Sequence, residues 1–250
     1  MTKTFSKLKN PPIKEVALDI AIDNYFSNIS EIDAICVEIE KTYPNKKPSF
    51  GIKPSINVNN NKLESVSEIT GYIFSNQDNT EILIIDKKRI IFVDRNKYAN
   101  FENFYSKFKK VFEQINKIKP IQNPREMGLK YANVFSLEQD EVINTNPPKV
   151  NFLPNFAAFD RSPEKKKFAG LTRFAGNYML QADNNTELIA FINTDLQFVG
   201  SPLRMQTVFV IDTLLRIKEI SLDADVAKLR EFKNEIFFAN VDSNIKEFEK

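Results

Sequence analysis

The sequence predicts an α+β protein of two related halves, each a mostly antiparallel sheet with a long helix packed on one face. Three observations lead to this prediction. Many short segments alternate apolar and polar residues with a period of two, as half-buried strands do. One long segment, Phe101 to Ile118, instead spaces its apolar residues three and four apart, as an amphipathic helix does. The third observation is an internal repeat.

The first half, residues 1–122, is predicted to contain five strands and two helices. Ser30 is expected to cap a helix that runs to Tyr43 and ends before Pro44. Asn100 is expected to cap the second helix, and Pro120 ends its pattern. The strands are predicted at residues 15–22, 51–58, 67–75, 81–85 and 89–94.

The second half, residues 123–250, is predicted to follow the same plan. Its strands are expected at residues 126–137, 172–182, 187–193 and 203–217, and its long helix at 223–239. Residues 144–154 are rich in Pro and Asn and are typical of a loop. Ser243 is expected to cap a final short turn.

The repeat aligns Tyr72 to Ile82 with Tyr178 to Leu188 without a gap, at an interval of 178 − 72 = 106 residues. Each copy reads as a strand, an Asn-Thr turn and a second strand. Similar turn residues alone would be a weak signal, because hairpins often choose them. The shared order and spacing of the flanking segments favour an internal duplication, within two domains or within one continuous domain.

The absence of histidine narrows the chemistry open to the chain. Histidine titrates unaided near neutrality and is the commonest metal ligand. Its absence excludes Ser-His-Asp and Cys-His nucleophile systems and most zinc sites. The six glycines form neither standard phosphate-binding loop. We therefore expect binding rather than catalysis and no cofactor, although Ser-Lys and Thr-based nucleophiles stay open.

Cysteine content and hydropathy favour the cytoplasm. The single Cys36 excludes an internal disulfide, and its place on an apolar helical stripe predicts a buried thiol. No apolar run approaches the roughly 18 residues of a membrane-spanning helix. The first ten residues lack the apolar core of a signal peptide. We expect a cytoplasmic protein without a membrane partner.

Three segments carry a resemblance to a family: residues 10–16 (Asn-Pro-Pro-Ile-Lys-Glu-Val), 98–104 and 125–134. In these segments and in its length, the chain resembles a sporadically distributed family of uncharacterised bacterial and archaeal proteins that begin with an Asn-Pro-Pro-Ile-x-Glu motif. Lys130 and Val134 replace arginines of the family's third motif. The resemblance implies no activity, and the sporadic distribution implies mobile accessory genes, such as a defence or toxin-neutralising system.

The candidate binding residues are polar side chains set among apolar ones. Asp212 lies within the apolar run from Val208 to Leu215, where an unpaired buried carboxylate would be costly. We expect it to pair with Arg173 or Arg204 from neighbouring strands, as a structural ion pair rather than a catalytic acid. The candidate binding residues are Arg125, Lys130, Asn133, Arg173, Arg204 and Asp212.

A metal site is a weaker hypothesis. Asp19 and Asp23 lie four residues apart on a predicted strand, so both project from one face, and with Asp212 they would suit the magnesium site of a hydrolase. The alternating pattern around them favours a solvent-facing row of side chains instead. We expect no metal.

Residues 87–119 hold ten basic and three acidic residues, within a chain of net charge +2. An exposed basic surface of this kind would bind nucleic acid through phosphate contacts. The nearby phenylalanines belong to the buried stripe of the helix, so stacking on bases is not expected and a solvated face is favoured. The candidate contacts are Lys107, Lys109, Lys110 and Lys117.

Taken together, these patterns predict a non-catalytic binding protein that engages a macromolecular partner, most simply another protein. Open sheets leave edges that must be covered, and a homodimer is one way to cover them. The alternative is a nucleic-acid-binding or nucleic-acid-processing protein that uses residues 87–119.

Overall fold

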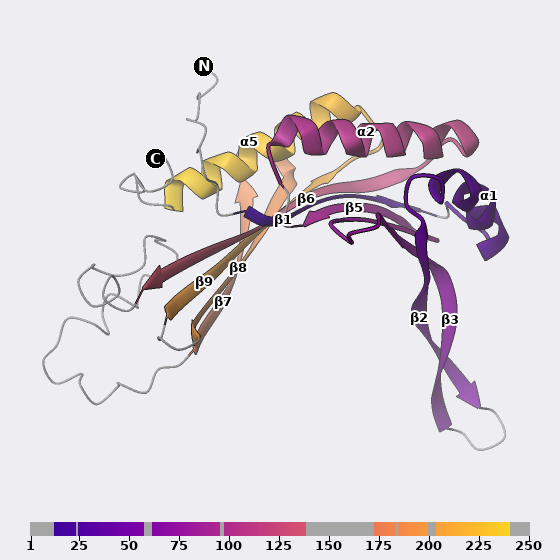
Figure 1. Ribbon diagram of the computed structural model, residues 1–250, viewed down its shortest axis with the longest axis horizontal. Coiled ribbons are helices and arrows are strands. Elements are labelled where there is room, and N and C mark those ends of the chain that lie inside the picture. Colours follow the sequence, from indigo (N-terminus) through magenta and orange to yellow (C-terminus); the bar gives the residue numbers. More distant parts are fainter. Residues whose placement is uncertain are drawn as a thin grey trace, which may run out of the picture. The chain divides into compact units, whose positions relative to one another are not determined.

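The structure is a computed structural model that describes residues 13–23, 25–57, 62–95, 98–138, 173–183, 185–199 and 204–240 (Figure 1). These residues form nine strands and three helices, which confirms the predicted α+β class. The strands are hydrogen-bonded in the order β2-β3-β4-β5-β1-β6-β9-β8-β7. The antiparallel pairs are β1 with β5, β2 with β3, β3 with β4, β4 with β5, β7 with β8 and β8 with β9.

The chain divides into two compact units. The amino unit comprises the described parts of Glu15–Gly128 with Arg216–Ser221, and the carboxy unit comprises those of Met1–Lys14, Leu129–Leu215 and Leu222–Lys250. The division falls inside β6, a few residues after the boundary predicted at 122 and 123. A short return segment after β9 also belongs to the amino unit, because the Ile217 backbone N–H donates to the Arg125 carbonyl at 3.0 Å.

The amino unit follows the predicted order of elements. Its strands are β1 (Ile13–Ile22) from Glu15 onward, β2 (Asn45–Asn57), β3 (Lys62–Ser75), β4 (Glu81–Asp86), β5 (Arg89–Arg95) and the start of β6 (Pro124–Glu138). Its helices are α1 (Ile29–Ile39) and α2 (Phe101–Ile118).

One side of the amino unit's sheet packs against α2. Leu18, Phe92, Leu83 and Phe74 face each other across four neighbouring strands, and all four are fully buried. The Phe92 ring lies 5.6 Å from that of Phe104 and 6.4 Å from that of Phe108, both on α2. The aromatic stripe of the helix therefore forms the core, as its spacing predicts.

The helix caps confirm one prediction and correct another. Asn100 caps α2, because its Oδ1 accepts a hydrogen bond from the Asn103 backbone N–H at 2.8 Å. The cap of α1 is Asn28 rather than Ser30, whose hydroxyl instead donates to Asn28 Oδ1. The side-chain oxygen of asparagine can accept a hydrogen bond from the backbone N–H three residues later, just as a serine hydroxyl can. Helix α1 ends at Ile39 rather than at Tyr43.

Strands β2 and β3 form a longer hairpin than predicted. Strand β2 contains Pro48 and Pro54, and two prolines are tolerated because β2 lies at the end of the strand order. Strand β4 pairs only with Gly71 to Ser75 of β3. The rest of the hairpin extends beyond β4 (Figure 1).

The carboxy unit contains β7 (Arg173–Ala182), β8 (Asn185–Val199), β9 (Arg204–Arg216) and α5 (Leu222–Asn240). Its core joins Ala190, Ile192, Phe209 and Ile211 of the sheet to Ile236 and Phe237 of α5. The helix thus covers one side of β8 and β9. The predicted loop at 144–154 and the turn at Ser243 lie outside the described residues.

The repeat holds up to its turn and then slips by one residue. Tyr72 and Tyr178 both lie on the helix-covered side, because they pair with Ile85 and Ile192. Beyond the turn, their partners Ile85 and Ile192 are 192 − 85 = 107 residues apart instead of 106. The first hairpin turns through residues 76–80, whereas the second has a shorter turn and a register shift at Gln181 that leaves extra residues on β8, so the gapless alignment is wrong there.

Candidate binding faces and a buried lysine

The three candidate binding residues of β6 do not converge. Asn133 is buried, and its Nδ2 donates to the Phe209 carbonyl at 3.0 Å, which makes it part of the core. Lys130 is half-buried at an alternate position of the strand and therefore projects from the opposite side. Arg125 is exposed, and its guanidinium lies 3.3 Å from Glu126 and 3.9 Å from Asp23.

Asp212 lies on the helix-free side of the carboxy unit instead of in the core. It is half-buried, and it pairs with Phe191 on β8. Arg204 is eight residues away on the same strand, about 27 Å at the rise of a strand, and Arg173 pairs with Gln197 opposite Gln206. The register therefore places both arginines beyond the reach of Asp212, contrary to the predicted pairing.

The proposed magnesium ligands of β1 serve as ion-pair partners. The Asp19 carboxylate lies 3.6 Å from Arg89 Nε, and Asp23 is mostly exposed beside Arg125. Among the residues described, no group of three or more acidic or cysteine side chains is arranged to hold a metal ion.

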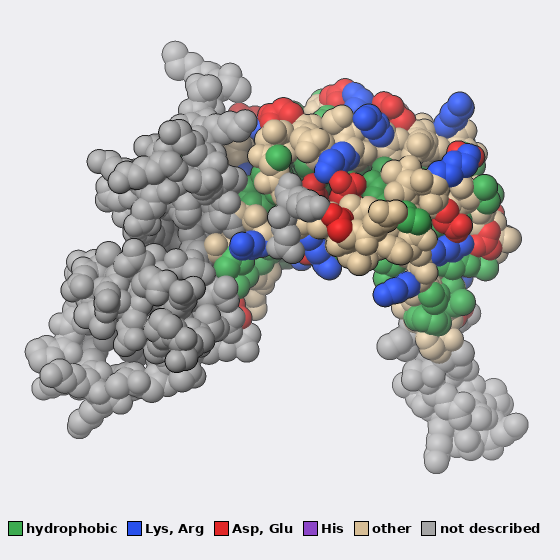
Figure 2. All heavy atoms as spheres, in the orientation of Figure 1, with side chains coloured by type: hydrophobic (Ala, Val, Ile, Leu, Met, Phe, Trp, Pro, Cys, Tyr) green, Lys and Arg blue, Asp and Glu red, His purple; other side chains and the backbone are tan. Residues whose placement is uncertain are grey.

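Acidic side chains neutralise much of the basic stretch 87–119. The lysine ammonium groups contact carboxylates in three pairs: Lys87 with Glu68 at 3.4 Å, Lys107 with Glu81 at 2.7 Å, and Lys119 with Glu31. Arg89 and Arg95 also pair with acids of neighbouring strands. In the amino unit, Figure 2 shows basic and acidic side chains intermixed over the face drawn. Lys110 and Lys117 remain exposed on α2.

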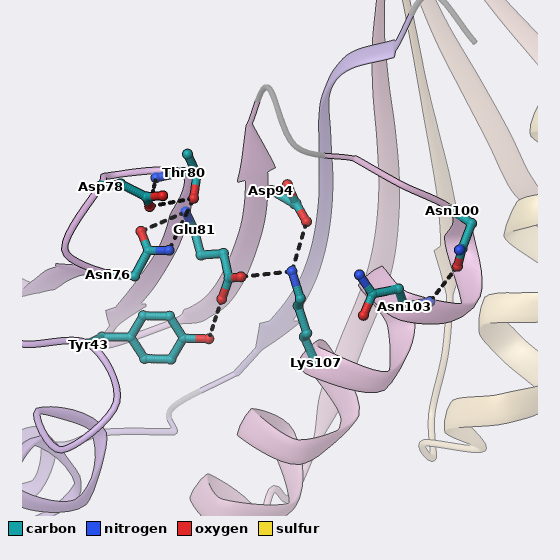
Figure 3. A network of polar contacts seen from close by, with 9 residues as sticks. All are labelled: Tyr43, Asn76, Asp78, Thr80, Glu81, Asp94, Asn100, Asn103 and Lys107. Carbon is teal, nitrogen blue, oxygen red and sulfur yellow. Dashed lines mark hydrogen bonds and ion pairs between the residues drawn. The ribbon is translucent and has the colours of Figure 1, made fainter. Parts of the chain in front are cut away.

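Lys107 links α2 to the sheet through a partly buried polar cluster (Figure 3). Its Nζ lies 2.7 Å from Glu81 and 3.4 Å from Asp94, whose side chain is almost fully buried. The Tyr43 hydroxyl donates to the other oxygen of Glu81 at 3.2 Å. Asn76 and Asp78 hold the adjoining turn through hydrogen bonds to Glu81 and Thr80.

The electrostatics of this cluster indicate a structural role. Burial alone would lower the pKa of Lys107, but the hydrogen bond and charge of Glu81, together with Asp94, raise it overall. Burial raises the pKa of the Tyr43 hydroxyl well above its usual range, and the Glu81 charge raises it further. Neither group changes its charge near neutral pH, so neither is tuned for proton transfer.

An apolar row crosses the helix-free side of the amino unit's sheet. Ile73, Ile84 and Ile91 pair in register across β3, β4 and β5, and each is half-buried. Beyond them, Phe50 and Ile69 pair across the β2–β3 hairpin, but the register shift between Ser49 and Phe50 places this pair on the other side of the hairpin. We call Ile73, Ile84 and Ile91 the isoleucine row. Aliphatic groups partly exposed together in this way are typical of interaction surfaces.

The carboxy unit has a smaller counterpart. Met179 of β7 pairs with Phe191 of β8, and they are 67% and 40% exposed. Phe191 in turn pairs with Asp212. The helix-free side of this unit therefore combines two large apolar side chains with one acid.

Lys233 is a site residue that our sequence predictions missed. The residues of α5 that face the core are Val226, Leu229, Ile236 and Phe237. Lys233 falls on the same stripe, four residues after Leu229 and three before Ile236. A lysine at a core-facing position of an amphipathic helix is the signal that could have revealed it.

Two aromatic rings lie close to the Lys233 amine. Its Nζ lies 4.1 Å from the centroid of the buried Tyr131 ring and 5.9 Å from that of Phe237. No described carboxylate forms an ion pair or hydrogen bond with it. Burial, followed by the charge of Arg230 one turn earlier, lowers the pKa of Lys233 to about 7. Ring faces attract the charged form, but desolvation outweighs that attraction.

This pKa makes stability depend on pH. Between pH 7 and 10.5 the unfolded chain binds more protons at Lys233 than the folded chain does, so this lysine makes stability rise with pH in that window. We expect Lys233→Met to remove the rise and to increase the free energy of unfolding at pH 6 by about 2 kcal/mol. Urea unfolding from pH 6 to 10 measures both effects.

Lys218→Met is the control, because Lys218 is an exposed lysine with no ion pair among the described residues. It should change the free energy of unfolding by less than about 0.5 kcal/mol. An unaltered pH slope in Lys233→Met would contradict the lowered pKa.

The chain matches no known protein-family model and shows no significant similarity to a curated protein. Asn10 to Pro12, at the start of the first resemblance motif, lie outside the described residues. No helix in the described part of the chain is long and apolar enough to cross a membrane.

Proposed function

We propose that this chain is a non-catalytic, cytoplasmic binding protein that engages a protein partner through the isoleucine row. The observation that carries the proposal is the contrast between the two sides of the amino unit's sheet. Phe92 is fully buried beneath α2, whereas its neighbour Ile91 is half-exposed on the other side. No described helix of this unit covers that side.

The charges around the row favour a protein over a nucleic acid. Arg89 lies 3.1 Å from Glu126 and 3.6 Å from Asp19, and Arg95 lies 2.7 Å from Glu15. Arginines already paired with carboxylates cannot neutralise phosphates without losing those partners. An apolar row between neutralised charges suits the apolar patch of another protein.

The two units also support the predicted duplication, which we include in the proposal. The amino unit runs β3, β4, β5 and α2 with β1 beside β5, and the carboxy unit runs β7, β8, β9 and α5 with β6 beside β9. In both, the side of the sheet without a described helix bears large apolar groups. The expectation of a defence or toxin-neutralising system stays a prediction.

Changing the centre of the row tests the function. Ile84→Asp should abolish co-purification of the partner from the native host and weaken binding of the purified partner at least tenfold in calorimetry. A buried charge at the interface centre costs more than the apolar contact it replaces. Circular dichroism checks that the variant is folded.

Val37→Asp is the control, because Val37 is 64% exposed on α1, away from the row. It should bind as the unaltered protein does. Equal binding by both variants would reject the row as the interface. Loss of a dimer in Ile84→Asp by analytical ultracentrifugation would identify the partner as a second copy. Salt-sensitive binding of DNA or RNA that Lys110→Glu and Lys117→Glu abolish would favour the alternative.

A further inference from the structure

The outer edge of β7 carries an inference that goes beyond partner binding at the isoleucine row. Strand β7 ends the strand order, so no described strand pairs with its outer backbone groups. Edge strands that must stay unpaired often carry proline or lysine, which block or repel an added strand. Strand β2, at the other end of the order, has five such residues: Lys46, Lys47, Pro48, Lys53 and Pro54. Strand β7 has neither residue type.

The exposed side chains of β7 indicate that the element it lacks is another strand. Met179 and Leu180 are 67% and 38% exposed. Successive residues of a strand point to opposite sides of the sheet, so these two side chains lie on different sides. A helix laid on the sheet would cover only one of them, whereas a strand added at the edge would bring side chains beside both. The edge of β7 therefore suits the addition of a strand.

A second copy of β7 fits this edge by symmetry and by charge. Neighbouring pairs of an antiparallel ladder alternate between hydrogen-bonded and non-hydrogen-bonded, and a two-fold axis preserves that alternation only if one residue lies opposite its own copy. With Tyr178 on the axis, Arg173 of each copy lies opposite Asp183 of the other, because the two positions are equally far from Tyr178. Opposite charges then face each other at both ends of the ladder. An axis at Asn177 or Met179 loses both charge pairs.

The same register joins the apolar groups of the two copies. Met179 lies opposite Asn177 of the other copy, which makes the two Met179 residues diagonal neighbours on the helix-free side. Each Met179 also pairs with Phe191 of its own copy, so the apolar surface becomes continuous across the axis. About half of the ten residues of β7 point their backbone groups outward, so two copies form about ten hydrogen bonds, as many as a typical protein interface has.

We propose that this chain forms a homodimer in which two β7 strands pair antiparallel about Tyr178. The pairing joins the two sheets and leaves neither β7 as an edge. The isoleucine row belongs to the amino unit and takes no part in it. The dimer therefore presents two copies of the row to a partner.

Analytical ultracentrifugation of the full chain tests the dimer. We expect the unaltered protein to sediment as a dimer at micromolar concentration, and Met179→Lys to raise the dissociation constant at least about tenfold, because it places two like charges side by side at the axis. Met179 is exposed in the single chain, so the variant should stay folded, which circular dichroism checks. Val37→Lys is the matched control, since Val37 is 64% exposed on α1, and it should leave the dimer unchanged.

A charge exchange tests the register. Arg173→Asp and Asp183→Arg should each weaken the dimer, because each places like charges opposite one another. The double variant should restore it, since every pair again joins an acid to a base. A double variant that dimerises no better than the single ones would overturn the proposed pairing.

Three further results would overturn the proposal: a monomer at every concentration, a dimer that Met179→Lys leaves intact, or loss of the dimer in Ile84→Asp. A monomer is the result expected if another part of the same chain covers the edge of β7. We expect Ile84→Asp to lose its partner and keep the dimer. Failure of partner binding at the isoleucine row is thus distinguishable from failure of this dimer.

Discussion

Replacing Lys107 with methionine is expected to lower the free energy of unfolding by about 3 kcal/mol at pH 7. The ammonium lies between Glu81 and Asp94, and the Asp94 side chain is only 2% exposed. Without Lys107, these two carboxylates keep their charges with less compensation in a partly desolvated site. Urea unfolding followed by circular dichroism measures the loss.

Lys110→Met provides the matched control, since Lys110 is exposed on the same helix three residues further along. It should change the free energy of unfolding by less than about 0.5 kcal/mol. Adding Asp94→Asn to Lys107→Met should recover part of the loss, because the neutral amide no longer needs a cation. Equal stability of Lys107→Met and Lys110→Met would show that the cluster of Figure 3 contributes nothing to folding.

The same lysine shows where sequence reasoning about charge fails. Residues 87–119 are basic when counted along the chain, but Lys107 finds its acids on β4 and β5, and Lys119 finds Glu31 near the start of α1. Charge along a sequence ignores partners that the fold brings from elsewhere. A basic stretch therefore predicts an exposed basic surface only if no acidic side chains from neighbouring elements of the fold pair with it.

The elements themselves were largely predictable because their patterns are local. The spacing of the phenylalanines in α2 and the alternation in β1 require no knowledge of the rest of the fold. The errors concern element bounds and helix caps that depend on neighbouring strands or residues. Strand β2 extends back through Pro48 because it is an edge strand, and Asn28 caps α1 in place of Ser30.

The candidate site was less predictable, because burial depends on which side of a strand a residue occupies. Asp212 sits in an unbroken apolar run, yet alternate residues of β9 face opposite sides, and it takes the half-buried side with Val210 and Leu214. Its predicted arginine partners are excluded by register, which a single sequence does not show. Lys233 was detectable, since helical spacing alone places it between Leu229 and Ile236.

The second large effect is expected from Phe92→Ala, which should lower the free energy of unfolding by about 4 kcal/mol. The Phe92 ring is fully buried and contacts Tyr43, Phe104 and Phe108, so its removal leaves a cavity where α2 meets the sheet. Neighbouring rings cannot close this cavity without leaving their own contacts. Chemical denaturation at equilibrium gives the difference directly.

Ile91→Ala, one residue earlier on β5, is the control for Phe92→Ala. Both variants place alanine in the same strand, so the difference between them measures the loss of packing under α2. Ile91 projects from the opposite side of the sheet and is half-buried, so its truncation should cost only about 1 kcal/mol. Because Ile91 belongs to the isoleucine row, we expect the same variant to weaken partner binding, whereas Phe92→Ala acts on stability. If Ile91→Ala destabilised the fold as much as Phe92→Ala, both sides of the sheet would be packed equally, and the proposed interface would lose its physical basis.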